Sequence, residues 1–165
     1  MKGLEEIYLK GFDCDKYLEI ASQDEIEKTE VLYKNIVISN EYVNKIKSID
    51  KKVSVLISVE TWCPFARVFL MTLRKVNEIK HIFDLSLITY GRGVSELAGY
   101  LKIDEDDFVV PTAVFLDKSF SKLRIFNGFP EKYHNENTLD TIDATRNYLK
   151  GKSVNDILED ILMVF

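Results

Sequence analysis

A short, almost unbroken hydrophobic run that leads into a cysteine constrains this chain most. The run is Val53–Val59 (VSVLISV), followed by Trp62–Ala66 (WCPFA) and then by an amphipathic segment from Arg67 to Lys80. A continuous apolar run of this length is typical of a central strand that is covered on both faces, and the amphipathic segment predicts a helix. Cys63 is therefore expected where a buried strand ends and a helix begins.

The start of a helix suits an anionic cysteine. The first backbone N–H groups of a helix lack partners within the helix, and the helix dipole is positive at that end. A thiolate is an anion, and it is the form of cysteine that attacks other groups. Cys63 is therefore the predicted nucleophile of the chain.

The later patterns predict a mixed sheet. Residues 83–90 alternate enough to form a second strand, and it should run parallel to the first because a helix connects the two. Gly91-Arg92-Gly93 breaks that pattern, and a short helix is expected over 95–101. Strands at 113–116 and 123–126 are expected to form a hairpin, with a helix over 138–150. The expected order is β-α-β-α-β-β-α.

The ends of the chain carry further helix signals. Residues 1–30 are charged and are expected to be partly helical, with Asp13 or Asp15 as a cap. The segment 31–38 fits either a strand or a helix, and Ser39 or Asn40 is expected to cap a helix through Ile49. Near the other end, Gly151 stops one helix and Ser153 caps the last, with Asp156 three residues on.

The helix after Cys63 has two predicted faces. Its spacing places Ala66, Phe69, Leu73 and Val76 on an apolar side, and Arg67, Arg74, Lys75 and Glu78 on the opposite, polar side. The 165 residues suggest one domain over 1–165, with an N-terminal arm at 1–30 and a core over about 40–165.

Composition excludes several classes of function. A net charge of -5 and the lack of a basic stripe argue against a nucleic-acid partner. No apolar run approaches the ~20 residues of a membrane span, and the first residues lack a signal-peptide core, so the prediction is a cytoplasmic protein. Two cysteines and two histidines without ligand spacing predict neither a disulfide scaffold nor a metal site.

Two motifs together resemble the thioredoxin-like superfamily. That family has a strand, then W-C-x-x-C opening a helix, and later a cis-proline written (V/I)-P-T before another strand. Here Trp62 and Cys63 match the first motif and Val110-Pro111-Thr112 matches the second, but Ala66 replaces the second cysteine. The resemblance implies an α/β thioredoxin-like fold, with a mixed central sheet flanked by helices and an N-terminal helical extension.

The pattern is most similar to a branch of the family with a single-cysteine W-C-x-x-A motif. Members carry E-x-W-C-x-D-A or E-x-W-C-x-D-C, and later I-P-T followed by a D-K turn and a glycine-proline element. Glu60 and Asp117-Lys118 match, whereas Phe65 replaces the acid. The glycine-proline element resembles Phe126–Pro130, with Phe129 where the branch often has Arg.

The resemblance also implies the roles of the site residues. Cys63 is the expected nucleophile, and Pro111 the expected cis-proline, with the backbone of Val110 offered to an extended substrate. Substrate binding is further assigned to Trp62, Pro64 and Phe65. Thioredoxins use a buried acid six residues before the nucleophile, and that place is Ile57 here. Glu60 is a substitute proton-transfer group, or only a solvated carboxylate at the end of the strand.

The absent second cysteine leaves two functional readings. In the first, Cys63 acts alone in thiol–disulfide exchange with protein thiols or disulfides, without a bound cofactor and with a low-molecular-weight thiol as a possible co-substrate. In the second, the chain is a redox-inert adaptor that binds a protein segment through Trp62, Phe65 and Pro111. Cys14 is either a remote resolving thiol or an ordinary cysteine whose pKa the flanking Asp13 and Asp15 raise.

Overall fold

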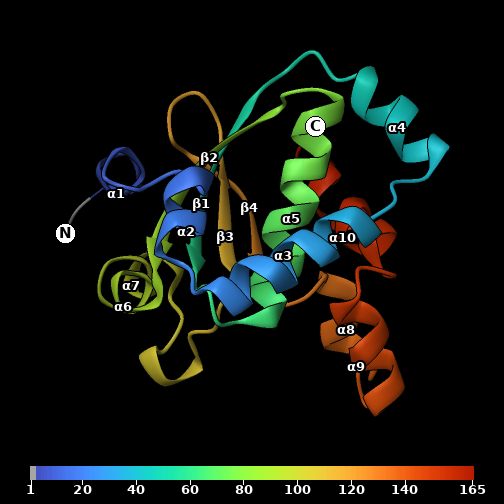
Figure 1. Cartoon of the computed structure of the whole chain (residues 1–165). Helices are drawn as coiled ribbons and strands as arrows, with labels where there is room; N and C mark the ends of the chain where they lie inside the picture. The colour runs from blue at the N-terminus through green and yellow to red at the C-terminus, as the bar shows by residue number, and fades with distance from the viewer. Residues whose placement is uncertain (1–2) are drawn as a thin grey trace.

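A four-stranded mixed sheet forms the centre of the protein, and helices cover both of its faces (Figure 1). The computed structural model describes residues 3–165. The strands are β1 (Val53–Val59), β2 (Phe83–Thr89), β3 (Thr112–Leu116) and β4 (Lys122–Asn127), in the spatial order β2-β1-β3-β4. β1 is parallel to β2 and antiparallel to β3, which pairs with β4 in a hairpin. The predicted fold class and the interior position of the first strand are confirmed.

The register of the sheet determines where the candidate site lies. Ser58 at the end of β1 is opposite Thr112 at the start of β3. The segment that follows β1 and the segment that precedes β3 therefore leave the sheet at the same edge. This arrangement brings the loop carrying Cys63 next to Val110 and Pro111.

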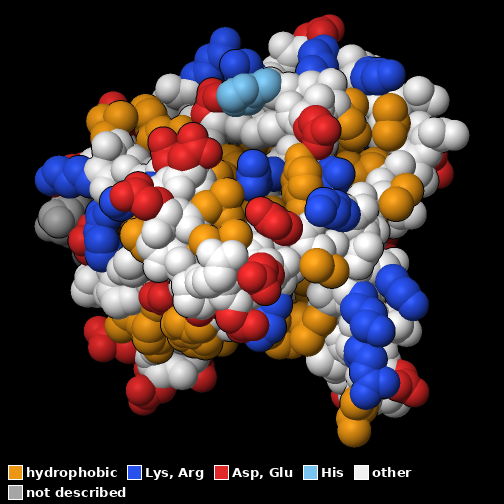
Figure 2. Space-filling model, in the orientation of Figure 1, with side chains coloured by type: hydrophobic (Ala, Val, Ile, Leu, Met, Phe, Trp, Pro, Cys, Tyr) orange, Lys and Arg blue, Asp and Glu red, His pale blue; other side chains and the backbone are white. Residues whose placement is uncertain are grey.

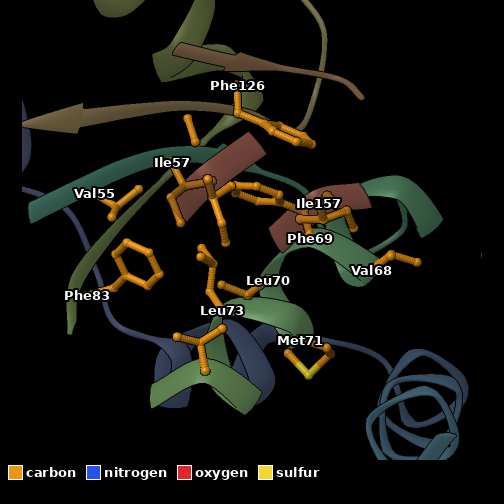
Figure 3. Packing of buried hydrophobic residues seen from close by; sticks show 14 of the residues in the cluster. Val55, Ile57, Val68, Phe69, Leu70, Met71, Leu73, Phe83, Phe126 and Ile157 are labelled. Atoms are coloured by element: carbon orange, nitrogen blue, oxygen red, sulfur yellow. The ribbon is translucent and has the colours of Figure 1, made fainter. Parts of the chain in front are cut away.

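One face of the sheet is covered by α5 (Pro64–Ile79) and α10 (Val154–Ile161). Phe69 of α5 is fully buried, and its ring stacks on Phe126 of β4 with 4.2 Å between the centroids. Val55 and Ile57 point from β1 into the same cluster (Figure 3). Burial of this apolar area is the main force that holds α5, and with it Cys63, against the sheet.

The other face has its own smaller cluster. Leu56 of β1 and Val114 of β3 pack there against α1 (Leu4–Leu9) and against a continuous helical segment made of α6 (Tyr90–Arg92), the π-helical turn η1 (Gly93–Leu97) and α7 (Ala98–Leu101). Successive residues of β1 thus point to opposite, fully buried faces, as a nearly unbroken apolar run predicts.

The helical segment after β2 begins earlier than predicted. Gly91-Arg92-Gly93 is helical, because the Thr89 side chain caps the Arg92 N–H and a Glu60 carboxylate oxygen accepts from the Tyr90 N–H at 2.8 Å. The glycine at position 93 does not interrupt the helix. It allows the helix to pack closely against β1. A Cβ there would lie 2.4 Å from Ser58 Oγ.

The N-terminal arm is helical. α2 (Cys14–Ile20) is capped by Asp13, as predicted, and α3 (Gln23–Asn35) starts with a capping box of Ser22 and Glu25. The segment 31–38, whose sequence fits either a strand or a helix, is therefore helical through Asn35. α4 (Asn40–Lys47) ends before Ile49. The short 3₁₀ turn η2 (Glu105–Asp107) lies between α7 and β3.

The C-terminal helices differ in detail from the prediction. The expected helix over 138–150 is α9 (Ile142–Leu149), preceded by α8 (Glu131–Asn135) and followed by Gly151 with φ +79. Ser153 is the N-cap residue of α10, as predicted, but its side chain makes no capping hydrogen bond. Asp156 instead pairs with Lys132 Nζ at 2.5 Å, which leaves its carboxylate unavailable for a capping box. The chain ends in the 3₁₀ turn η3 (Leu162–Val164).

None of the helices within residues 3–165 combines the length and hydropathy needed to cross a membrane.

Candidate functional site

Cys63 is the N-cap residue of α5, and Pro64 occupies the first helical position. Pro64 suits this place because its fixed φ fits a helix and its missing N–H would have had no partner there. The Cys63 thiol donates a hydrogen bond to the carbonyl oxygen of Val110, with 3.5 Å between sulfur and oxygen. Cys63 is only 6% exposed. The structure thus places the thiol at the helix start and beside the segment before β3.

The Val110–Pro111 peptide bond is cis, as the resemblance implied. Two contacts hold this segment: the Gly128 N–H donates to the Pro111 carbonyl at 2.7 Å, and the Thr112 hydroxyl donates to the Val109 carbonyl at 2.7 Å. The glycine after β4 and the threonine of the V-P-T motif therefore both position the chain that faces Cys63.

The two aromatic residues that flank Cys63 in sequence lie in different surroundings. The side chain of Trp62 is 63% exposed. Phe65 is half-buried, and its ring packs edge-on against Phe129 with 5.1 Å between the centroids and also contacts Tyr148. Phe65 thus joins the start of α5 to the segment after β4, while Trp62 is presented to solvent.

Glu60 has a structural partner. Besides the bond from its carboxylate to the Tyr90 N–H, its carbonyl oxygen accepts a hydrogen bond from the Tyr17 hydroxyl at 3.4 Å. Glu60 therefore links β1, α6 and the N-terminal arm. Its role in proton transfer stays a prediction.

Arg67 was predicted on the polar side of α5, and this is wrong. Arg67 is only 8% exposed, because α3 packs over that side of α5. Its Nη2 donates to the Thr61 carbonyl at 3.1 Å, and its buried Nε has no hydrogen-bond partner in the described part of the chain. A buried cation thus lies one helical turn after the predicted nucleophile.

Tyr17 is a second residue that the sequence did not assign to the site. Its side chain is 1% exposed, and burial raises its pKa to about 12, with the Arg67 charge opposing the shift and the Cys63 sulfur adding to it. The Tyr17 hydroxyl therefore lies within electrostatic reach of both groups. The N-terminal arm therefore contributes directly to the surroundings of Cys63.

Cys14 is half-buried, and its pKa is raised to about 11. Burial is the largest cause, Arg74 opposes it, and Asp13 and Asp15 add to it, so the predicted direction is confirmed but the main cause is different. A thiol with this pKa is almost wholly protonated at neutral pH, which makes it a poor nucleophile.

Alkaline pH is expected to weaken the fold through Cys14. Between its ordinary pKa of 9.0 and its folded value of about 11, the unfolded chain ionises first, so stability is lost as pH rises through this window and is unaffected below it. We expect the free energy of unfolding in urea to fall by about 1–2 kcal/mol from this group, a value reduced because Cys14 is partly exposed. Cys14→Ala should show a smaller loss between pH 8 and 10.5; an equal loss would contradict this assignment.

No group of acidic, histidine and cysteine side chains that could hold a metal ion occurs among residues 3–165. Ile57, where thioredoxins carry an acid, is completely buried among apolar side chains.

The fold is shared with solved structures. A protein of unknown function from Pseudomonas aeruginosa superposes with a TM-score of 0.88 at 18% sequence identity, covering 99% of this chain and 97% of that one. An HIV epitope scaffold gives the same TM-score, identity and coverage. At this identity the likeness shows the fold alone. No curated protein is similar enough to this chain to count as a match.

A family model described as thioredoxin matches residues 11–140. The match spans most of the chain, including β1, Cys63, α5 and the cis-proline segment. The chain therefore belongs to the thioredoxin family.

Proposed function

We propose that this protein carries out thiol–disulfide exchange through Cys63 as its single reactive thiol. The observation that supports this most is the position of Cys63 at the N-cap of the 16-residue helix α5, beside Val110, with Ala66 where a dithiol family member has its second cysteine. The backbone N–H groups and the dipole at the helix start interact favourably with an anionic nucleophile, and the alanine removes the internal thiol that could release a mixed disulfide.

The reaction has two steps. The Cys63 thiolate attacks one sulfur of a substrate disulfide, a new bond forms to that sulfur, and the other sulfur leaves as a thiolate with the bonding electron pair. A second, external thiolate then attacks the sulfur bound to Cys63, forms a new disulfide with it, and regenerates the Cys63 thiolate. No net oxidation of the protein occurs. This cycle suits exchange with mixed disulfides between a protein and a small thiol.

Three features support a protein as the other substrate. Trp62 is exposed next to the thiol and offers a flat apolar surface, and the exposed Val109 side chain lies next to Val110. The Val110 backbone would pair with an extended segment, as β-type recognition requires.

We also propose a cytoplasmic location, where small thiols are kept reduced.

The test is the fate of Cys63 in the presence of glutathione disulfide. We expect Cys14→Ser protein to gain one glutathionyl group, seen by intact-mass spectrometry, and reduced glutathione to remove it. The matched Cys63→Ser protein, which keeps Cys14, should gain none under the same conditions, with an unchanged melting temperature. An adduct of equal amount on the Cys63→Ser protein would refute the assignment.

A redox-inert adaptor is the second candidate, and the 6% exposure of Cys63 favours it. In that case the exposed Trp62, 63% accessible, would be the centre of a binding surface and Cys63 only its buried support. The adaptor reading predicts that Cys63→Ser changes no measurable property of the protein, whereas Trp62→Ala abolishes partner binding.

A further inference from the structure

A groove lies beside the first turn of α5. It has a volume of about 380 Å³ and is bordered by α3, by the start of α5 and by the end of α9. Val31, Leu32, Pro64 and Leu149 supply its apolar lining. Figure 2 shows the surface hollowed between the lobe at the lower right, where α9 lies, and the rest of the molecule, with Lys and Arg side chains gathered on that lobe. Pro64, the residue after Cys63 in sequence, is part of this lining.

The charges of the groove do not cancel. Lys28 is paired with Asp24 at 2.6 Å, and the Glu27 carboxylate accepts a hydrogen bond from Gln23 at 3.2 Å. Arg67 and Lys150 also line the groove, and within residues 3–165 neither takes part in an ion pair. The groove is lined by three cations and two carboxylates, so its lining carries one excess positive charge.

Arg67 gives the groove a fixed positive charge. Its guanidinium is held by the Thr61 carbonyl, yet its Nε–H is buried and unpartnered in the described structure. The Glu25 carboxylate is close enough for the Arg67 charge to lower its pKa, but it is already bonded to the Ser22 N–H of the capping box. Because Nε is buried, an anion in the groove would interact with the positive charge of the guanidinium and not directly with this N–H.

We infer that the groove between α3, α5 and α9 binds the anionic end of a small carboxylate-bearing thiol, which is the low-molecular-weight co-substrate of Cys63. This inference rests on the proposed exchange activity and specifies its substrate class. Pro64 and Leu149 would contact the carbon chain of the ligand, while Arg67 and Lys150 would hold its carboxylate. In the cycle above, this thiol is the group that forms the mixed disulfide with Cys63 and, as a second molecule, the thiolate that removes it.

The experiment compares two disulfides that share the same S–CH2–CH2 unit and differ in the charge of the end group. The disulfide of 3-mercaptopropionate carries a carboxylate at each end, and the disulfide of 2-mercaptoethanol carries a hydroxyl. The rate of mixed-disulfide formation is measured for Cys14→Ser protein, with and without Lys150→Glu, by quenched mass spectrometry. Lys122→Glu is the matched control, because Lys122 is exposed on β4 and does not line the groove. Each rate of a variant is divided by the rate of the same disulfide with the parent Cys14→Ser protein. Differences in intrinsic reactivity between the two disulfides therefore cancel.

We expect Lys150→Glu to slow the reaction of the anionic disulfide about three- to tenfold and to change the neutral one less than twofold. Lys122→Glu should change neither reaction rate by more than about twofold. Added salt should reduce the difference in rate between the parent and Lys150→Glu for the anionic disulfide. Equal effects on both disulfides, or an equal effect of Lys122→Glu, would overturn the groove while leaving exchange by Cys63 intact. If neither disulfide reacts with Cys63 at all, the proposed exchange activity fails, and the inference fails with it.

Discussion

Replacing Ala66 with cysteine is expected to accelerate the reduction of a protein disulfide at least about a hundredfold. Ala66 lies in the first turn of α5, at the position from which dithiol members of the family resolve the mixed disulfide. A neighbouring thiol converts an intermolecular step into an intramolecular one, and effective concentrations for such steps are very large. Reduction of insulin by Ala66→Cys protein, regenerated with dithiothreitol, measures the gain.

The control for this gain is Ala144→Cys, which adds a thiol on α9 and leaves the helix start unchanged. It should reduce insulin no faster than the parent. Ala66 is completely buried, so the added sulfur costs about 1–3 kcal/mol of stability, and the melting temperature must be recorded alongside. A folded Ala66→Cys protein without any gain would show that the groups around Cys63, which include Ile57 in place of an acid, do not support the second step.

Phe69→Ala is expected to reduce the free energy of unfolding by about 3–5 kcal/mol. Phe69 is fully buried, stacks on Phe126 and lies at the centre of the cluster that fixes α5 to the sheet (Figure 3). The loss is a large part of the about 5–15 kcal/mol that holds a typical domain together. Urea denaturation followed by circular dichroism measures it.

Ile142→Ala serves as the control, because Ile142 is 77% exposed at the start of α9. It should change stability by no more than about 0.5 kcal/mol. A Phe69→Ala loss as small as that of the control would mean that the cluster does not determine how α5 is held.

Local patterns predicted the parts of the fold that depend on neighbours in sequence. The apolar run of β1 and the amphipathic period of α5 specify a strand and a helix, so Cys63 between them could be placed before the structure was known. Asp13 caps α2 as expected for the same reason, since a capping bond joins residues only three apart. The V-P-T motif located the cis peptide bond through the family resemblance.

Long-range contacts explain the errors. The burial of Arg67 depends on α3, which is separated from α5 in the sequence by α4 and β1. The periodicity of α5 alone therefore placed this arginine on a solvated face. The helix at Tyr90 depends on a carboxylate from Glu60, 30 positions away. At Ser153 the last long helix starts where predicted, but the Asp156 carboxylate that a capping box would need is paired with Lys132 of α8. In each case the partner is far away in sequence.

The same reason limited the prediction of the site. Cys63, Trp62, Val110 and Pro111 are recognisable from their motifs, whereas Tyr17 belongs to an arm that the motifs do not cover. One signal for Arg67 was available: it lies four residues after Cys63, so helical spacing alone places it one turn above the thiol. A cation at that spacing from a predicted nucleophile can be tested as part of the site.

The alkylation rate of Cys63 tests the central claim most directly. Cys14→Ser protein is treated with iodoacetamide at neutral pH, once folded and once unfolded in urea, and the modified fraction is followed by mass spectrometry. We predict that Cys63 reacts at least as fast in the folded protein, because it lies at the N-cap of α5, where free backbone N–H groups and the helix dipole interact favourably with an anionic nucleophile. Protection by a factor of about ten or more on folding would contradict this prediction and favour the redox-inert adaptor.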